Sequence, residues 1–253
     1  MTLGSHLTPL ARRHIETADV VFTATSDGVI ELWLQKMHRD VRSLQPFYQE
    51  GRSRAHTYRA MVEAIMEEVR AGKRVCGAFY GHPGVFATVA HNAIEAARTE
   101  GFDALMEPGI SAADCLYADL AIDPGRVGCQ HFEATQFLMF QRRIDPTAYL
   151  VLWQVGVAGD VSLKRFATTA AHRQVLVDVL LRDYAADHEV VLYEAATLPT
   201  HRARVARFKL RELPNVEVSM HATLVVPPNG AMAPDLAIRE RLAALDSTNK
   251  ENT

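Results

Sequence analysis

The stretch that most constrains this chain runs over residues 74–86. Val75–Tyr80 is an apolar run, which is the pattern of a strand buried on both faces of a parallel sheet. Gly81-His82-Pro83-Gly84 then breaks the run, and a helix is predicted from Val85 to about Thr99. Glycines let a backbone approach a ligand closely, and open α/β sheets bind ligands at the carboxyl ends of their strands. The turn is therefore either a ligand site or an ordinary strand–turn–helix connection.

Composition narrows the class of protein. With 253 residues, 48% of them hydrophobic, the chain is long enough for a sizeable core in one or two domains. A net charge of −3 and a pI near 6.4 give no electrostatic argument for nucleic acid or an anionic membrane as a partner. Three cysteines without paired spacing indicate a reduced protein, and neither a signal peptide nor a membrane span is predicted. We therefore expect a soluble, cytoplasmic protein.

Helices and strands are predicted to alternate along the chain, which indicates the α/β class. The predicted helices are Pro9–Thr17, Asp27–Met37, Thr57–Ala71, Val85–Thr99, one from Ser111, Thr169–Tyr184 and Pro234–Leu245. The predicted strands are Asp19–Phe22, Asp40–Leu44, Arg74–Tyr80, Ala104–Met106, Tyr149–Val155, Glu189–Glu194 and Ala222–Val226. A turn at Asp123-Pro124-Gly125 divides two α/β domains, 1–123 and 124–228, and residues 229–253 form a C-terminal helix and a disordered polar tail.

The beginning of the chain lacks an element that the pattern requires. A helix followed by a strand is half of a βαβ unit, but Met1–Leu7 is too short and too polar to be the strand before the first helix. We therefore expect a first strand to be missing from the N-terminal domain. Three explanations stay open: a start placed too far downstream, a shortened chain, or another segment that fills the gap.

Common catalytic motifs are absent from the sequence. Neither the dinucleotide-binding G-x-G-x-x-G, the P-loop nor the hydrolase G-x-S-x-G occurs. The 11 histidines show no metal-ligand spacing, so no metal site is predicted.

Several motifs together resemble one family. They are Tyr80-Gly81-His82-Pro83-Gly84-Val85-Phe86, Glu107-Pro108-Gly109-Ile110-Ser111-Ala112, Leu152-Trp153-Gln154, Tyr193-Glu194-Ala195 and Ala222-Thr223-Leu224. Their order is similar to that of the borosin peptide α-N-methyltransferases, a branch of the tetrapyrrole-methylase fold. The resemblance covers about Leu3 to Pro228, and it is greatest to the split bacterial form, whose precursor peptide is a separate chain. Relatives begin with an apolar strand that ends in Gly-Thr-Gly, where Met1 stands here.

The resemblance implies S-adenosylmethionine as the cofactor, held in a cleft between the two domains and released as S-adenosylhomocysteine. Small side chains beside a Gln amide and a Thr hydroxyl suit adenine and the methionine part. The implied cofactor residues of the first domain lie in or near the Gly81-His82-Pro83-Gly84 turn, here called the organising turn: Tyr80, His82, Val85 and Ala87. Those of the second domain are Gln154, Ala195, Ala222 and Thr223.

The resemblance also implies that the catalytic residues are Tyr48, Arg54 and Tyr58, with Arg54 and Tyr58 at the family's spacing of four. A backbone amide nitrogen is a poor nucleophile because its lone pair is delocalised into the carbonyl. An Arg fork can hold the developing carbonyl oxyanion, and a tyrosinate whose pKa that Arg lowers can accept the amide proton. The alternative is a solvated Arg with two tyrosines that pack the start of a helix.

Three functions follow as hypotheses. The first is the α-N-methylation of backbone amides in a separate ribosomal precursor peptide, in the maturation of a peptide natural product, by a homodimer that can form a 2:2 complex with the precursor. The second is a tetrapyrrole methylase, against which Arg54 with Tyr58 and the Trp153-Gln154 pair argue. The third is a catalytically silent peptide-binding protein. Nucleic acid and membranes are not expected as partners.

Overall fold

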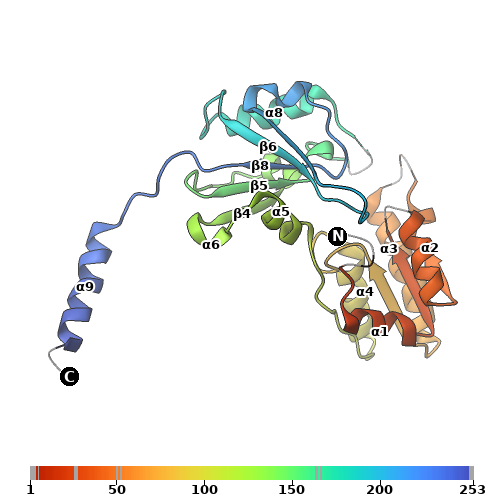
Figure 1. Ribbon diagram of the computed structural model, residues 1–253. Helices are drawn as coiled ribbons and strands as arrows, with labels where there is room; N and C mark the ends of the chain where they lie inside the picture. The colour runs from red at the N-terminus through yellow and green to blue at the C-terminus, as the bar shows by residue number, and fades with distance from the viewer. Residues whose placement is uncertain are drawn as a thin grey trace.

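The computed structural model has two bodies, each built on its own sheet, and a C-terminal helix that lies away from both (Figure 1). The residues that it describes are 4, 6–25, 28–49, 51, 53–162, 165 and 167–250. Within them, no helix is long and apolar enough to cross a membrane.

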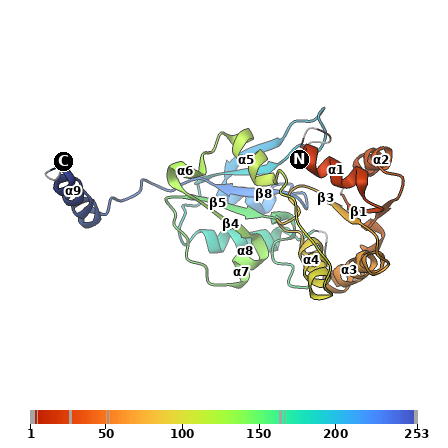
Figure 2. The ribbon, with the colours of Figure 1, turned by 90° about the horizontal axis from the view of Figure 1, so that it is seen from below.

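The first sheet has three parallel strands in the order β2-β1-β3. Its strands are β1 (Val20–Ala24), β2 (Val41–Ser43) and β3 (Val75–Phe79). Helices α1 (Pro9–Thr17) and α2 (Gly28–Met37) lie on one face, and α3 (Arg54–Arg70) and α4 (Thr88–Thr99) lie on the other (Figure 2). The β1 strand is buried, whereas β3 is only half-buried because it lies at an edge of the sheet. The prediction that β3 is a parallel strand is confirmed, but the prediction that it is buried on both faces is wrong.

The second sheet has the order β4-β5-β8-β6-β7, in which only β4 and β5 are parallel. Its strands are β4 (Cys129–Glu133), β5 (Tyr149–Trp153), β6 (Glu189–Glu194), β7 (Arg204–Lys209) and β8 (Thr223–Val226). One face carries α7 (Ala134–Met139), α8 (Ala170–Leu180) and the 3₁₀ helix η3 (Leu210–Asn215). The other face carries α5 (Ala112–Leu120) and the short α6 (Pro124–Val127), with α5 contributing Leu116 to the apolar cluster there.

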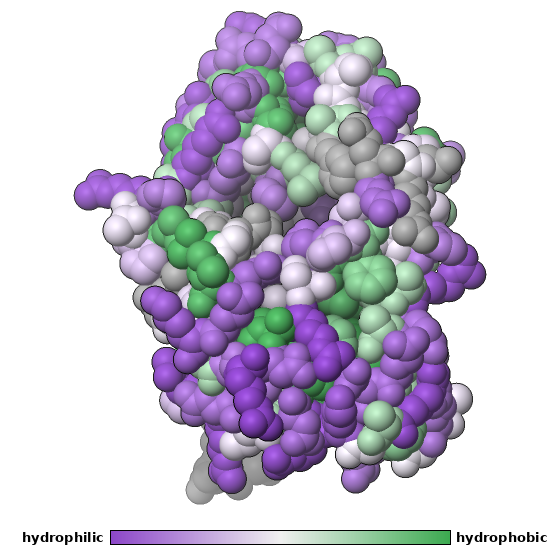
Figure 3. All heavy atoms as spheres, turned by 90° about the vertical axis from the view of Figure 1, so that its right-hand side faces the viewer, coloured by the Kyte–Doolittle hydropathy of each residue, from purple (hydrophilic) through white to green (hydrophobic). Residues whose placement is uncertain are grey.

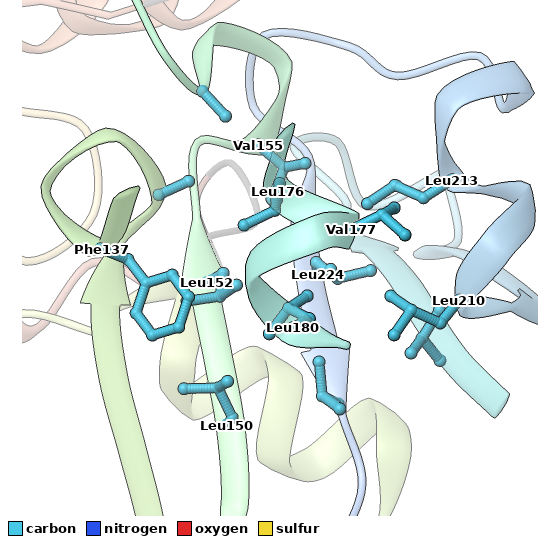
Figure 4. Packing of buried hydrophobic residues seen from close by; sticks show 14 of the residues in the cluster. Phe137, Leu150, Leu152, Val155, Leu176, Val177, Leu180, Leu210, Leu213 and Leu224 are labelled. Atoms are coloured by element: carbon cyan, nitrogen blue, oxygen red, sulfur yellow. The ribbon is translucent and has the colours of Figure 1, made fainter. Parts of the chain in front are cut away.

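Strand alternation divides the β5 side chains between two apolar clusters. Leu150 and Leu152 point to the α8 face, where they meet Leu176 and Leu180 (Figure 4). Val151 and Trp153 point to the opposite face and meet Leu116 of α5 there. Because β5 is buried on both faces, the uninterrupted apolar run in the sequence is explained.

On the side that carries α2 and α3, the surface of the molecule is mainly polar. Figure 3 shows the side that carries α2 and α3, where hydrophilic residues cover most of the surface and apolar residues form small separate areas. Val29 and Leu32 of α2 are examples of exposed apolar side chains.

Several predicted boundaries are wrong for identifiable reasons. The helix expected from Val85 begins at Thr88, because Phe86 has a positive φ of 53° that a right-handed helix does not allow. The strand expected to reach Val155 ends at Trp153, because Gln154 is left-handed. The helix expected from Thr57 starts at Arg54, so Thr57 is a buried residue inside α3.

Other differences concern whole elements. Strands β4 and β7 and helix α7 were not predicted, and a turn was predicted where α6 forms. Residues 104–106 were expected to form a strand but have irregular backbone, since no strand pairs with them among the described residues. The last helix, α9 (Leu236–Lys250), starts later and extends further than predicted, and the rest of the predicted tail lies outside the described residues, as does the predicted helix start at Asp27. The division at Asp123 stays a prediction.

Candidate functional site

The organising turn, Gly81–Gly84, is held by one histidine of its own and by one histidine of α4. The Nδ1 atom of His82 accepts a hydrogen bond from the Gly84 N–H at 3.0 Å, and the ring of His91 bonds the Gly84 carbonyl at 2.9 Å. Gly81 has a positive φ of 79°. A Cβ at Gly109 would lie 2.7 Å from the Gly81 carbonyl oxygen, so the two loops approach as closely as glycine allows. The turn is therefore a rigid feature at the carboxyl end of β3.

An aromatic contact joins this turn to the second body. The ring centroid of Phe86 lies 5.9 Å from that of Trp153, at the end of β5. Phe86 is 52% exposed and has a positive φ, which is unusual for a bulky residue. Backbone strain of this kind is found at functional sites, and here it directs the Phe86 ring toward Trp153.

Trp153 is oriented in turn by His131 of β4. Its indole N–H donates to Nδ1 of His131 at 3.0 Å, and the two rings stack with centroids 5.7 Å apart. The other ring nitrogen, Nε2, lies 2.7 Å from the Tyr117 hydroxyl. Because Nδ1 accepts the hydrogen bond from Trp153, it carries no proton, so the ring is neutral; burial favours this form by lowering the pKa of His131. Neither residue was expected from the sequence: His131 lies on β4, which has a weak strand pattern, and Tyr117 lies on α5 outside any recognised motif.

Four of the predicted cofactor residues meet at one edge of the second sheet. Gln154 follows β5, Ala195 follows β6, and Ala222 precedes β8. Because β8 runs antiparallel to both β5 and β6, its start lies beside their ends. Thr223 pairs with Tyr193 in this register. The structure therefore brings these four positions together, as the sequence predicted.

Gln154 stands out within this group. Its φ of 59° and ψ of 40° are left-handed, and the following Val155 N–H donates to the Ala222 carbonyl at 3.0 Å. No hydrogen bond is recorded for the Gln154 amide or the Thr223 hydroxyl within the described part of the chain. Gln154 is half-buried, whereas Thr223 is only 2% exposed, so the Gln154 amide is the more accessible of the two groups.

The residues from the first body are less closely gathered. A cavity of about 620 Å³ lies beside β3 and is lined by Tyr80, but His82, Val85 and Ala87 do not line it. Val85 is 45% exposed. His82 acts electrostatically on Asp114 of α5, where it adds slightly to a lowered pKa that chiefly reflects the hydrogen bond from Ser111.

The predicted catalytic residues surround the start of α3. The rings of Tyr48 and Tyr58 meet edge to face with centroids 6.3 Å apart. Arg54, the first residue of α3, lies one turn before Tyr58 and is half-buried. Its guanidinium donates to the backbone carbonyl of Arg165 at 2.8 Å. The trio is therefore assembled, and Arg54 binds a peptide carbonyl of the second body.

The charge state of Tyr48 differs from the expectation for a tyrosinate. Burial is the main cause that raises its pKa to about 12, and the hydrogen bond to Tyr58 adds to this effect. Arg54 lowers the pKa, but by less. Desolvation therefore outweighs the cation, and Tyr48 is a neutral phenol at physiological pH.

The residues present fit S-adenosylmethionine in donor chemistry. Ala195 and Ala222 are small, as a site for a planar base requires, and the half-buried amide of Gln154 and the buried hydroxyl of Thr223 are the polar groups beside them. The neighbouring Tyr193 already has a hydrogen-bond partner, since its hydroxyl donates to Asp119 at 2.7 Å.

Comparison with known proteins identifies the family and the fold of this chain. The family profile of the tetrapyrrole (corrin/porphyrin) methylases matches residues 3–214. The chain belongs to the tetrapyrrole methylase family. A solved structure of uroporphyrin-III-C-methyltransferase from Thermus thermophilus has a TM-score of 0.64 at 20% identity and covers 90% of each chain. A second structure of that enzyme, complexed with S-adenosylhomocysteine, has a TM-score of 0.60 at 16% identity, over 89% of this chain and 88% of the other. The predicted fold is confirmed.

Within the family, the curated relatives are borosin-type methyltransferases. One, from Coprinopsis marcescibilis, is named a methyltransferase/ribosomally synthesised type I borosin cyclic peptide precursor and is 42% identical over 249 residues, covering 96% of this chain and 63% of the relative. Another, from Omphalotus olearius, is named a methyltransferase and precursor of omphalotin A and is 37% identical, covering 94% of this chain and 58% of the relative. The borosin resemblance is confirmed. The chain spans about 60% of the length of these relatives, whose names join enzyme and precursor.

Proposed function

We propose that this chain is an S-adenosylmethionine-dependent methyltransferase that methylates backbone amide nitrogens of a ribosomal precursor peptide. The observation that carries the proposal is the trio at the start of α3, where Arg54 binds a backbone carbonyl beside two tyrosines in contact. The names of the relatives support the same substrate class.

Arg54 has the chemistry to hold the reacting amide. In the structure its guanidinium binds the Arg165 carbonyl, which is the same chemical group as the carbonyl of a peptide substrate. When the amide loses its proton, negative charge moves onto that oxygen, and a guanidinium at hydrogen-bond distance stabilises it. Arg54 would therefore exchange the Arg165 carbonyl for the substrate carbonyl.

The two tyrosines have different roles in the removal of the amide proton. Tyr48 keeps its proton, because its pKa is raised to about 12, and it is hydrogen-bonded to Tyr58. We assign Tyr58 as the group that accepts the amide proton, so that the nitrogen lone pair becomes available. The bound cofactor would supply an electrophilic methyl group for this nitrogen.

The cofactor would lie against Gln154, Ala195, Ala222 and Thr223, with Tyr80 facing it from the first body. His82, Val85 and Ala87 would act through the shape of the turn, since they do not line the cavity beside β3. Phe86 and Trp153 keep the turn next to the end of β5.

We also propose that the precursor is accepted as a separate chain and that the enzyme is a cytoplasmic homodimer that forms a 2:2 complex with it. These statements rest on the resemblance found in the sequence. An assay that offers the precursor in trans tests the first of them directly.

The test of the function is methylation of a precursor peptide followed by mass spectrometry. We expect Arg54→Ala to lower the rate about 10²–10³-fold, the usual effect of removing an oxyanion donor. Arg54→Lys should restore little, because a point charge does not reproduce the planar fork. Tyr58→Phe should lower the rate about 10²–10⁴-fold while its ring still packs.

Arg59→Ala is the matched control, since Arg59 is an exposed neighbour on α3, and it should leave the rate unchanged. Cofactor affinity, measured by calorimetry, should stay within about twofold in all four variants, because these groups act in the transition state. Wild-type rates in both Arg54→Ala and Tyr58→Phe would contradict the mechanism. Failure of the unmodified chain to bind S-adenosylmethionine would favour the silent peptide-binding protein.

A further inference from the structure

Asp160, in the loop between β5 and α8, carries a buried carboxylate. The residue is only 4% exposed. Its Oδ1 atom accepts hydrogen bonds from the Ser162 N–H at 3.1 Å and from the Ser162 hydroxyl at 2.5 Å. Its Oδ2 atom accepts a hydrogen bond from the Arg165 N–H at 2.8 Å. Because a buried donor or acceptor that loses its partner is costly, Asp160 fixes the backbone at Arg165.

The base of this loop lies beside Gln154. The Thr168 N–H and the Thr168 hydroxyl donate to the Gly156 carbonyl at 2.9 and 3.2 Å. The Asp160 N–H donates to the Val157 carbonyl at 3.1 Å. These bonds give the loop a fixed base next to the candidate cofactor edge.

The same loop reaches the first body at Arg165. The Nη2 atom of Arg54 donates to the Arg165 carbonyl at 2.8 Å. The Arg165 backbone is therefore held on both sides, by Asp160 at its N–H and by Arg54 at its carbonyl. A peptide substrate offers Arg54 the same chemical group. The Arg165 carbonyl is thus an internal competitor for the donor that a substrate carbonyl needs.

We propose that Asp160 is a positioning residue that sets the KM for the peptide, because it holds the Arg165 carbonyl on Arg54 until a substrate carbonyl replaces it. This inference rests on the proposed function of Arg54. A substrate binds only those molecules in which Arg54 is released, so the internal carbonyl raises the apparent KM. After the replacement the loop has no part in the chemical step, and kcat should not depend on Asp160.

Asp160→Asn releases Arg165 with little change in shape. The amide of Asn has one acceptor oxygen where the carboxylate has two. Keeping both bonds from Ser162 requires this oxygen at the Oδ1 position, which turns the NH₂ group toward the Arg165 N–H. Two donors then face each other, so the bond to Arg165 is lost while the turn at Ser162 remains.

The first test measures KM and kcat for methylation of the precursor peptide. In Asp160→Asn, KM should fall about three- to tenfold, the effect of one competing hydrogen bond, while kcat stays within about twofold. A merely structural role predicts the opposite sign, since a damaged site raises KM or lowers kcat. An unchanged or raised KM in Asp160→Asn, or a lowered kcat, would overturn the proposal.

Asp145→Asn is the matched control. Oδ1 of Asp145 accepts from the Thr147 N–H at 2.9 Å and from the Thr147 hydroxyl at 2.7 Å, as Asp160 does from Ser162, but this turn precedes β5. The control should leave KM and kcat unchanged. Arg165→Pro is a second releasing variant, because it removes the N–H that Asp160 binds and changes an exposed side chain. It should lower KM as Asp160→Asn does.

A second test needs no methylation activity. Phenylglyoxal modifies guanidinium groups, and mass spectrometry of the digested protein gives the rate at each arginine. Asp160→Asn should speed the modification of Arg54 about threefold or more, because its guanidinium is released. The rates should stay unchanged at exposed Arg59 and at Arg173, whose guanidinium binds the Pro214 carbonyl at 2.9 Å.

The two tests separate this inference from the proposed function. An Arg54 rate that is equal with and without Asp160→Asn would overturn the inference, whether or not the protein methylates a peptide. A faster Arg54 rate in a protein that does not methylate would support the hold of Asp160 on Arg54 and contradict the proposed function alone.

Discussion

At the scale of single residues, the backbone is most unusual where the two bodies meet. Phe86 and Gln154 are two of the three non-glycine residues with a positive φ among the described residues. One directs an aromatic ring to Trp153, and the other directly follows Trp153. Such conformations persist only where neighbouring contacts fix them, so this junction is the most specifically built part of the candidate site.

Tyr48 gives a prediction about alkaline pH. The unfolded chain releases a tyrosine proton at a pH of about 10, whereas the folded chain holds that of Tyr48 up to about 12. The folded state thus binds more protons between these values, and the free energy of unfolding falls as pH rises through them. In Tyr48→Phe, the free energy of unfolding should fall by about 1 kcal/mol less over this pH range than in the unmodified protein. This figure is reduced for solvent screening, because Tyr48 is partly exposed.

The measurement is urea unfolding of both proteins at several pH values from 8 to about 12, with an ultraviolet titration of the phenols. The difference between the two titrations should show one phenol with a midpoint near 12. A midpoint at or below 10 would mean that Arg54 outweighs burial, and that Tyr48 can itself act as the base.

At the scale of elements, helix α8 contributes buried side chains to the apolar core of the second body. Leu176 and Leu180 of α8 are fully buried against Leu150, Leu152 and Leu224 of the sheet (Figure 4). This packing fixes the strands β5 and β8; Gln154 directly follows β5, and Thr223 is the first residue of β8. The candidate cofactor edge therefore rests on this apolar cluster.

Leu176→Ala should lower the free energy of unfolding by about 2–5 kcal/mol, because it removes buried methyl groups and leaves a cavity. The matched control is Val175→Ala on the same helix, whose side chain is 52% exposed, and its effect should stay within about 0.5 kcal/mol. Chemical unfolding followed by circular dichroism measures both. Similar losses for the two variants would show that α8 does not dock as described.

At the scale of the whole molecule, α9 is separated from both bodies (Figures 1 and 2). Ile238, Leu242 and Leu245 follow a spacing of four and three, so they share one helix face, and all are exposed. A helix with an exposed apolar face is more stable when another surface covers that face. This observation supports the proposed homodimer.

We expect light scattering at micromolar concentration to give twice the chain mass of 28.1 kDa. Leu242→Asp should shift the mass toward one chain, because it puts a charge on the apolar face of α9, whereas Arg241→Glu on the neighbouring position should not. A wild-type mass of one chain would contradict the dimer. An unchanged dimer in Leu242→Asp would show that α9 does not contribute to it.

The sequence by itself determined the strands whose pattern is local. The apolar runs of β5 and β6 are buried on both faces, and the Gly-His-Pro-Gly turn follows β3 as predicted. The positions of the candidate cofactor edge match motifs at strand ends, and their role as cofactor residues stays a prediction. Hydrophobic periodicity and turn residues act between near neighbours in the chain, so they can be recognised from the sequence alone.

Only the tertiary structure decided the remainder. Strand β4 is half-buried, and its His131 acquires a role only when β5 brings Trp153 beside it. Tyr48 was expected to sit beside a cation that lowers its pKa, but burial among its neighbours raises it instead. The cavity beside β3 exists because an edge strand, two helices and the distant segment 103–110 enclose it. These properties depend on contacts between residues far apart in the chain, where burial and pairing override local preference.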